Sequence, residues 1–170
     1  DQLFNILKKI KHKLHFLQNI YLKNKYFYKK ISYAMDGEDL AIKEYTKNIR
    51  DGFYVDVGAH HPVQRSNTCH LYESGWRGVN IDVNDFTLDL FNYLRPDDIN
   101  IQSAVSDYNG EINLYYQKDF SQLNTTNENL AKDHFQNNYQ VKIIKCQTLN
   151  DLLNETKYRN KKINFLNIDV

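Results

Sequence analysis

Phe53-Tyr54-Val55-Asp56-Val57-Gly58-Ala59-His60-His61-Pro62 is the stretch of sequence that decides the fold. Its first five residues are aromatic or β-branched apart from one aspartate, and the glycine that follows can adopt backbone conformations that other residues avoid. This combination is typical of a buried strand that ends in a tight turn. We therefore predict a central strand over residues 53–57, with Asp56 near its carboxyl end and Gly58 in the turn.

Strand-like and helix-like segments alternate on the carboxyl side of this stretch. Short apolar runs predict further strands at residues 78–82, 99–105, 111–116, 140–147 and 165–169, the last of them buried. Apolar residues at helical spacing predict helices at residues 66–73, 86–94 and 148–153, and the polar residues 117–129 predict a loop. This alternation indicates an α/β fold with a mostly parallel sheet and helices on both faces.

A helix is also expected just before the first strand. The carboxylate of Asp36 would cap it, and Glu38 and Asp39 would lie in its first turn, where negative charge is favourable. We expect its buried side to consist of Leu40, Ala41, Ile42 and Tyr45.

Residues 1–30 differ from the rest in charge. They contain eight lysines against Asp1 alone, a formal charge of +7, while the whole chain of 170 residues carries only +1. Apolar residues recur every three or four positions between these lysines, which predicts a basic amphipathic helix. Two interpretations stay open: peripheral attachment to an anionic membrane surface, and packing of the helix on its own domain. Basic charge confined to one terminal segment gives no case for nucleic-acid binding.

The composition limits the remaining possibilities. With 41% hydrophobic and 25% charged residues, the chain of 170 residues is long enough for one globular domain, which we place at residues 31–170. No long uncharged apolar stretch and no secretory signal is present, so we expect a cytoplasmic protein. Cys69 and Cys146 lack the spacing of a zinc site, and we expect no metal centre and no disulfide. The chain starts with an aspartate and stops at Val170, and we expect it to be part of something longer.

Four carboxylates follow the ends of predicted strands: Asp56, Asp82, Asp107 and Asp169. Ligands of open parallel sheets bind beyond these ends. The turn after residue 57 lacks the GxGxxG spacing for a pyrophosphate, and the sequence has no P-loop. An acidic rim suits a ligand with a cationic centre, an amine and a ribose diol, and S-adenosylmethionine has all three. Each carboxylate also has a structural interpretation, in which it binds backbone N–H groups of a turn or a helix start.

Several motifs, in this order, resemble the FkbM family of S-adenosylmethionine-dependent methyltransferases. They are SYAMDGED (32–39), FYVDVGAHHP (53–62), SNT (66–68), GWRG (75–78), ID (81–82), AVSD (104–107), TLNDL (148–152) and NIDV (167–170). The resemblance covers about residues 31–170. It implies a class I, Rossmann-like methyltransferase fold with S-adenosylmethionine as cofactor. The implied reaction is O-methylation of a hydroxyl on a small-molecule, sugar or glycan acceptor.

The resemblance also implies roles for individual residues. Asp56 and Gly58 would shape the turn that faces the methionine portion, with His60 in the same pocket. Asp82, where many members carry glutamate, would hold the ribose, and Ser106 with Asp107 would lie by the adenine.

The candidates for the catalytic base are Asp169 or a residue beyond Val170, and His60; His61 is a weaker candidate. Family members continue after Val170 with further strands, so the resemblance implies a fold that is incomplete at its carboxyl terminus. The alternative to an enzyme is a non-catalytic nucleoside-binding or scaffold module.

Overall fold

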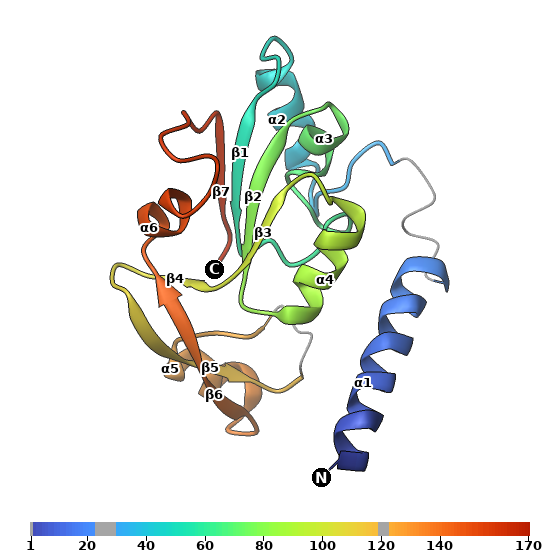
Figure 1. The fold of residues 1–170 in the computed structure, drawn as a ribbon, viewed down its shortest axis with the longest axis vertical. Helices are drawn as coiled ribbons and strands as arrows, with labels where there is room; N and C mark the ends of the chain where they lie inside the picture. Colours follow the sequence, from blue (N-terminus) through green and yellow to red (C-terminus); the bar gives the residue numbers. More distant parts are fainter. Residues whose placement is uncertain (1, 23–29, 119–122) are drawn as a thin grey trace.

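The computed structural model describes residues 2–22, 30–118 and 123–170. Its main sheet has four strands in the order β3-β2-β1-β7, and every neighbouring pair is parallel (Figure 1). The strands are β1 (Phe53–Val57), β2 (Arg77–Asp82), β3 (Ile99–Gln102) and β7 (Phe165–Ile168). The predicted parallel α/β sheet and its central strand are therefore confirmed.

Helices cover both faces of this sheet. Successive side chains of β1 point to opposite faces, and the residues on both faces are buried. Val55 belongs to a core cluster with Leu152 of α6 (Leu149–Asn154). Tyr54 packs instead with Leu71 of α3 (Cys69–Glu73), and Ile42 of α2 (Glu38–Thr46) joins this second cluster. A further helix, α4 (Asp85–Leu94), connects β2 to β3, as the sequence predicted.

A second, smaller sheet adjoins the first and has the order β4-β6-β5. It contains β4 (Ala104–Val105), β5 (Gly110–Tyr116) and β6 (Gln140–Gln147), with α5 (Glu128–Phe135) packed against β5. The prediction of one strand over residues 99–105 is wrong. The chain leaves the main sheet at Ser103, whose N–H donates to the carbonyl of Asp82 at 3.1 Å, and β4 then pairs with β6.

Two predicted helices differ from the structure. The helix expected over 66–73 begins only at Cys69, because Ser66 and Thr68 bind the buried Arg95 through their hydroxyl groups. Of the expected buried side of α2, Ile42 packs against the core, whereas Tyr45 is 88% exposed and Asp39 is the fully buried residue. Asp36 does not cap α2, whose N-cap is Gly37.

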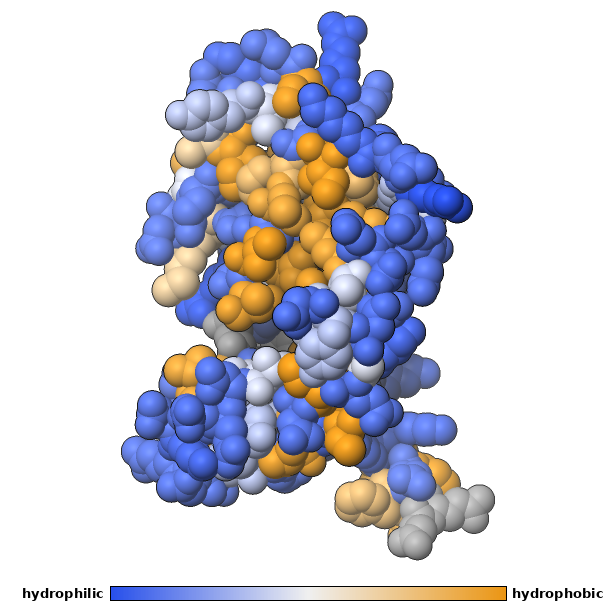
Figure 2. Space-filling model, turned by 90° about the vertical axis from the view of Figure 1, so that its left-hand side faces the viewer, coloured by the Kyte–Doolittle hydropathy of each residue, from blue (hydrophilic) through white to orange (hydrophobic). Residues whose placement is uncertain are grey.

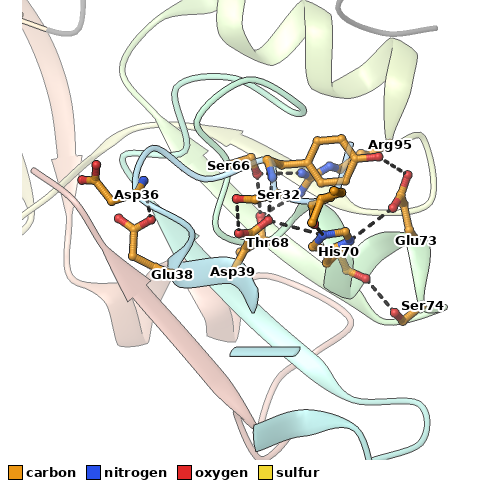
Figure 3. Close-up of polar contacts among 12 residues, drawn as sticks. Ser32, Asp36, Glu38, Asp39, Ser66, Thr68, His70, Glu73, Ser74 and Arg95 are labelled. Atoms are coloured by element: carbon orange, nitrogen blue, oxygen red, sulfur yellow. Dashed lines mark hydrogen bonds and ion pairs between the residues drawn. The ribbon is translucent and has the colours of Figure 1, made fainter. Parts of the chain in front are cut away.

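Asp39 is the buried anchor of the segment that leads into the domain (Figure 3). Its carboxylate accepts hydrogen bonds from the Ser32 hydroxyl at 2.6 Å and from the Tyr33 N–H at 2.7 Å. His70 of α3 lies 3.5 Å from the same carboxylate and also binds the carbonyl of Ile31 at 2.9 Å. Through these contacts Asp39 and His70 hold residues 31–33 against the starts of α2 and α3.

The amino-terminal helix predicted over residues 1–30 is present as α1 (Gln2–Leu17) and a π-helical turn, η1 (Gln18–Leu22). Residues 23–29 of that prediction lie outside the described residues, as do residues 119–122 of the predicted loop. At the other end of the chain, β7 is not buried as expected: it forms one edge of the main sheet, and Ile168 is 60% exposed. Figure 2, seen from the side of β7 and α6, shows apolar side chains gathered in the middle of this face.

Candidate functional site

A cleft lies at the carboxyl end of β1 and β7, with a cavity volume of about 130 Å³. This is smaller than a typical small-molecule site of roughly 300–1,000 Å³, so the cleft has room for only part of such a ligand. Four segments of the chain contribute its lining: Met35 and Glu38; Asp56, Gly58, Ala59 and His60; Arg65, Ser66 and Asn67; and Asn167 with Asp169.

The floor of the cleft is a close approach between the β1 turn and the end of β7. Gly58 has a φ of +75°, and a Cβ at this position would lie 2.0 Å from the carbonyl oxygen of Asp169. The Asp169 N–H donates to the carbonyl of Val57 at 3.0 Å, which holds the two segments together. Only glycine fits here, for reasons of both conformation and space.

Asp56 is buried beside this turn, and both of its carboxylate oxygens are hydrogen-bonded. The Thr68 hydroxyl donates to one at 2.7 Å, and the Asn167 side-chain amide donates to the other at 2.9 Å. Asn67 continues the chain of contacts by donating to the Asn167 side-chain oxygen at 3.1 Å. Burial raises the pKa of Asp56. Asp56 therefore joins the loop before α3 to the last strand, and both of these segments line the cleft.

Asp82 lies next to the cleft but does not line it. One of its oxygens accepts from the N–H of Asn84 at 2.8 Å, and the other accepts from the N–H of His60 at 2.8 Å. Burial raises the pKa of this carboxyl. Its contacts are those of the structural interpretation, yet each carboxylate oxygen has a further lone pair that can accept a ligand hydroxyl.

The two histidines of the turn have different surroundings. His60 lines the cleft in a left-handed conformation, φ 50°, and burial lowers its pKa to about 4, with Arg65 contributing. It is therefore neutral near pH 7 and a weak base. His61 is buried, and its Nδ1 accepts hydrogen bonds from the N–H groups of Val63 and Gln64 at 3.0 and 2.9 Å. His61 thus stabilises the turn.

Ser106 and Asp107 follow β4 and belong to the second sheet. The Ser106 N–H donates to the carbonyl of Gln147 at 3.0 Å, and its hydroxyl donates to Asp107 at 3.2 Å. Neither residue is part of the cleft lining. Of the four strand-end carboxylates, the structure thus brings Asp56 and Asp169 into one cleft, with Asp82 joined to it through the backbone of His60.

Arg95 is an important residue that the sequence did not reveal. It is fully buried after α4 and donates to the Pro62 carbonyl and to the hydroxyls of Ser66, Thr68 and Tyr54. These partners lie 27 to 41 residues earlier in the chain, so no local pattern marks the position. Arg95 holds the loop that supplies Arg65, Ser66 and Asn67 to the cleft.

Other lining residues were also missed as site residues. Met35, Asn67 and Asn167 belong to the family-like motifs, and this membership was a signal that could have identified them. Arg65 lies outside these motifs, so the sequence carried no such signal for it. Together, the lining combines one guanidinium group with the carboxyl groups of Glu38, Asp56 and Asp169. A cleft of this kind can bind a ligand that carries both charges.

An open parallel sheet with a glycine turn after its first strand and a polar cleft beyond the strand ends defines a class of protein. It is the α/β class that binds small ligands at the carboxyl edge of the sheet. The family model for the methyltransferase FkbM domain matches residues 56–170, and the chain belongs to this family. Comparisons with curated proteins and with solved structures gave no match. The resemblance drawn from the motifs is confirmed.

Two further observations concern the described residues only. They contain no group of three or more histidine, cysteine, aspartate or glutamate side chains placed to hold a metal ion. No helix among them has the length and apolar character needed to cross a membrane.

Proposed function

We propose that the protein is an S-adenosylmethionine-dependent methyltransferase that acts on a hydroxyl group of a sugar, glycan or natural-product acceptor. The observation that carries the proposal is the cleft beside Gly58, which combines charges of both signs in a chain of the FkbM methyltransferase family.

The cleft suits the amino-acid end of this cofactor. Arg65 offers a guanidinium group for the ligand carboxylate, while Glu38 and Asp169 offer carboxylates for its ammonium group. Gly58 has no side chain, so a ligand can approach the backbone of the turn closely. The described residues therefore fit the methionine portion of S-adenosylmethionine.

We assign the nucleoside portion from the family resemblance and the strand order. Asp82 ends β2, next to β1, and its remaining lone pairs accept the ribose hydroxyls. Ser106 and Asp107, which follow β4, would meet the adenine. This assignment requires the nucleoside to extend from the Gly58 turn past His60 and toward the second sheet.

Bound S-adenosylmethionine would supply a methyl group activated by a sulfonium centre. The protein contributes chiefly by holding donor and acceptor in line. Asp169 lies at the mouth of the cleft with its side chain exposed, and we propose it as the base that takes the proton of the acceptor hydroxyl. His60 is the second candidate, and its lowered pKa makes it the weaker one.

Calorimetric titration of the 170-residue chain with S-adenosylmethionine, and with NAD as a control ligand, tests the cofactor assignment. We expect binding of the first ligand only, because the turn lacks a pyrophosphate site. Transfer of a radiolabelled methyl group to a panel of sugars and polyols then tests the reaction. Binding without transfer to any acceptor favours the non-catalytic nucleoside-binding module, and a folded chain that fails to bind refutes the cofactor assignment.

A further inference from the structure

The amino-terminal helix α1 exposes an apolar stripe instead of burying it. Six leucine and isoleucine side chains recur at intervals of three or four residues and form this stripe: Leu3, Ile6, Leu7, Ile10, Leu14 and Leu17. Their exposed fractions range from 41% to 69%. With about 3.6 residues per turn, all six lie on one side of the helix.

The opposite side of α1 makes the contacts with the domain. His12 binds Asp89 of α4 at 2.8 Å, and the His15 ring stacks on Phe86 with centroids 4.6 Å apart. Ile20 of η1 is buried in the same cluster as Phe86 and Leu90. Figure 1 shows α1 at the margin of the molecule, beyond α4. Packing on the domain therefore does not cover the apolar stripe.

The charges around the stripe are of one sign. Lys8, Lys9, Lys11 and Lys13 belong to α1, and residues 2–22 contain no aspartate or glutamate. At helical spacing, Lys11 and Lys13 fall on the two edges of the apolar stripe. This pattern, an apolar face bordered by lysines, is that of helices that lie in the interface of a membrane.

We propose that α1 docks the protein onto an anionic lipid bilayer, with the apolar stripe in the interface and the lysines at the headgroups. Leu3, Leu7, Ile10, Leu14 and Leu17 also follow the four-and-three spacing of a coiled coil. A second copy, however, would add its own lysines beside the stripe, and residues 2–22 offer no acidic residue to pair with them across the interface. Negative headgroups attract the same lysines, so the charges favour the bilayer over a second copy.

Flotation of the 170-residue chain with vesicles tests this proposal. We expect binding to phosphatidylcholine vesicles that contain phosphatidylserine, little binding to phosphatidylcholine alone, and weakening with added salt. The double variant Lys11→Gln, Lys13→Gln should bind roughly 25-fold more weakly, since each lysine near the surface contributes about fivefold. Glutamine preserves helix propensity, and circular dichroism verifies the fold.

The control is the double variant Lys43→Gln, Lys162→Gln, which removes the same charge from two exposed positions outside α1. It should bind like the unmodified chain. Equal losses in the two variants, or no binding to anionic vesicles, overturn the proposal. Analytical ultracentrifugation tests whether a second copy covers the stripe instead. If the chain forms a dimer, the double variant Leu7→Ser, Leu14→Ser dissociates it, and the chain does not bind vesicles, the proposal is also overturned.

Discussion

Replacement of Arg95 by glutamine should be among the most damaging single changes in this protein. The variant removes a fully buried guanidinium group and leaves the Pro62 carbonyl and the hydroxyls of Ser66 and Thr68 without their donor. It also removes a positive charge that acts on the buried carboxyl of Asp98, which accepts from the Tyr54 hydroxyl and from the Gly78 N–H. Each buried polar group that is left without its partner costs about 1–3 kcal/mol, so the loss of Arg95 should cost several kcal/mol in total.

Arg77 provides a matched control in the same part of the molecule. It binds Asp97 at 3.1 Å, but the two side chains are 36% and 61% exposed. A partly exposed pair of this kind contributes about 0–1 kcal/mol, and the hydrogen bond of Arg77 to the Trp76 carbonyl at 2.7 Å about 1 kcal/mol more. Arg77→Gln should therefore lower the free energy of unfolding by clearly less than Arg95→Gln. The two variants remove the same group at a fully buried and at a half-buried site.

Urea denaturation of both variants measures the free energy of unfolding. A domain of this size is stabilised by about 5–15 kcal/mol, so Arg95→Gln should fold with a clearly lower midpoint. Arg95→Lys keeps the charge but loses the fork of donors, and it should fall between the unmodified protein and Arg95→Gln. If Arg95→Gln and Arg77→Gln lie within about 1 kcal/mol of each other, the role given to Arg95 is wrong.

Three further predictions concern the cleft. Gly58→Ala should lower the free energy of unfolding by more than the roughly 1–2 kcal/mol of a left-handed alanine, because the new Cβ meets the Asp169 carbonyl. Gly75→Ala is the control: Gly75 has a φ of +93° and nothing within 4 Å of the new Cβ, so this variant should lose only about 1–2 kcal/mol. Equal unfolding free energies of the two variants would contradict the close approach. Asp82→Asn should weaken binding of S-adenosylhomocysteine roughly 10- to 100-fold in calorimetry, and unchanged affinity would refute the ribose assignment. Because the pKa of His60 falls from 6.5 to about 4 on folding, the unfolded chain binds more protons between these values, and the free energy of unfolding should decrease as the pH drops through this window. His60→Asn, which tolerates the left-handed backbone, should remove this part of the pH dependence, and identical pH profiles would refute the assignment.

The sequence predicted local features better than long-range contacts. The strand at residues 53–57, the helix that ends before Pro96 and the Thr148 cap of α6 all depend on nearby residues, and the structure confirms them. The short α3 and the break at Ser103 were missed because their causes are contacts with Arg95 and Asp82, distant in the chain. The same holds for the site, where the motifs located Gly58 and Asp56 but not Arg65.

By itself, the sequence determined the α/β class, the parallel core and the family, because hydrophobic periodicity, glycine turns and ordered motifs are local properties of the chain. Only the tertiary structure decided which side chains meet. It gave Asp82 two backbone partners, enclosed Arg95, and turned the apolar side of α1 away from the domain that its other side contacts. These outcomes depend on burial and on contacts between segments that are far apart in the chain. The spacing of apolar residues along a helix shows that one face is apolar, but it does not show whether the domain covers that face or the opposite one.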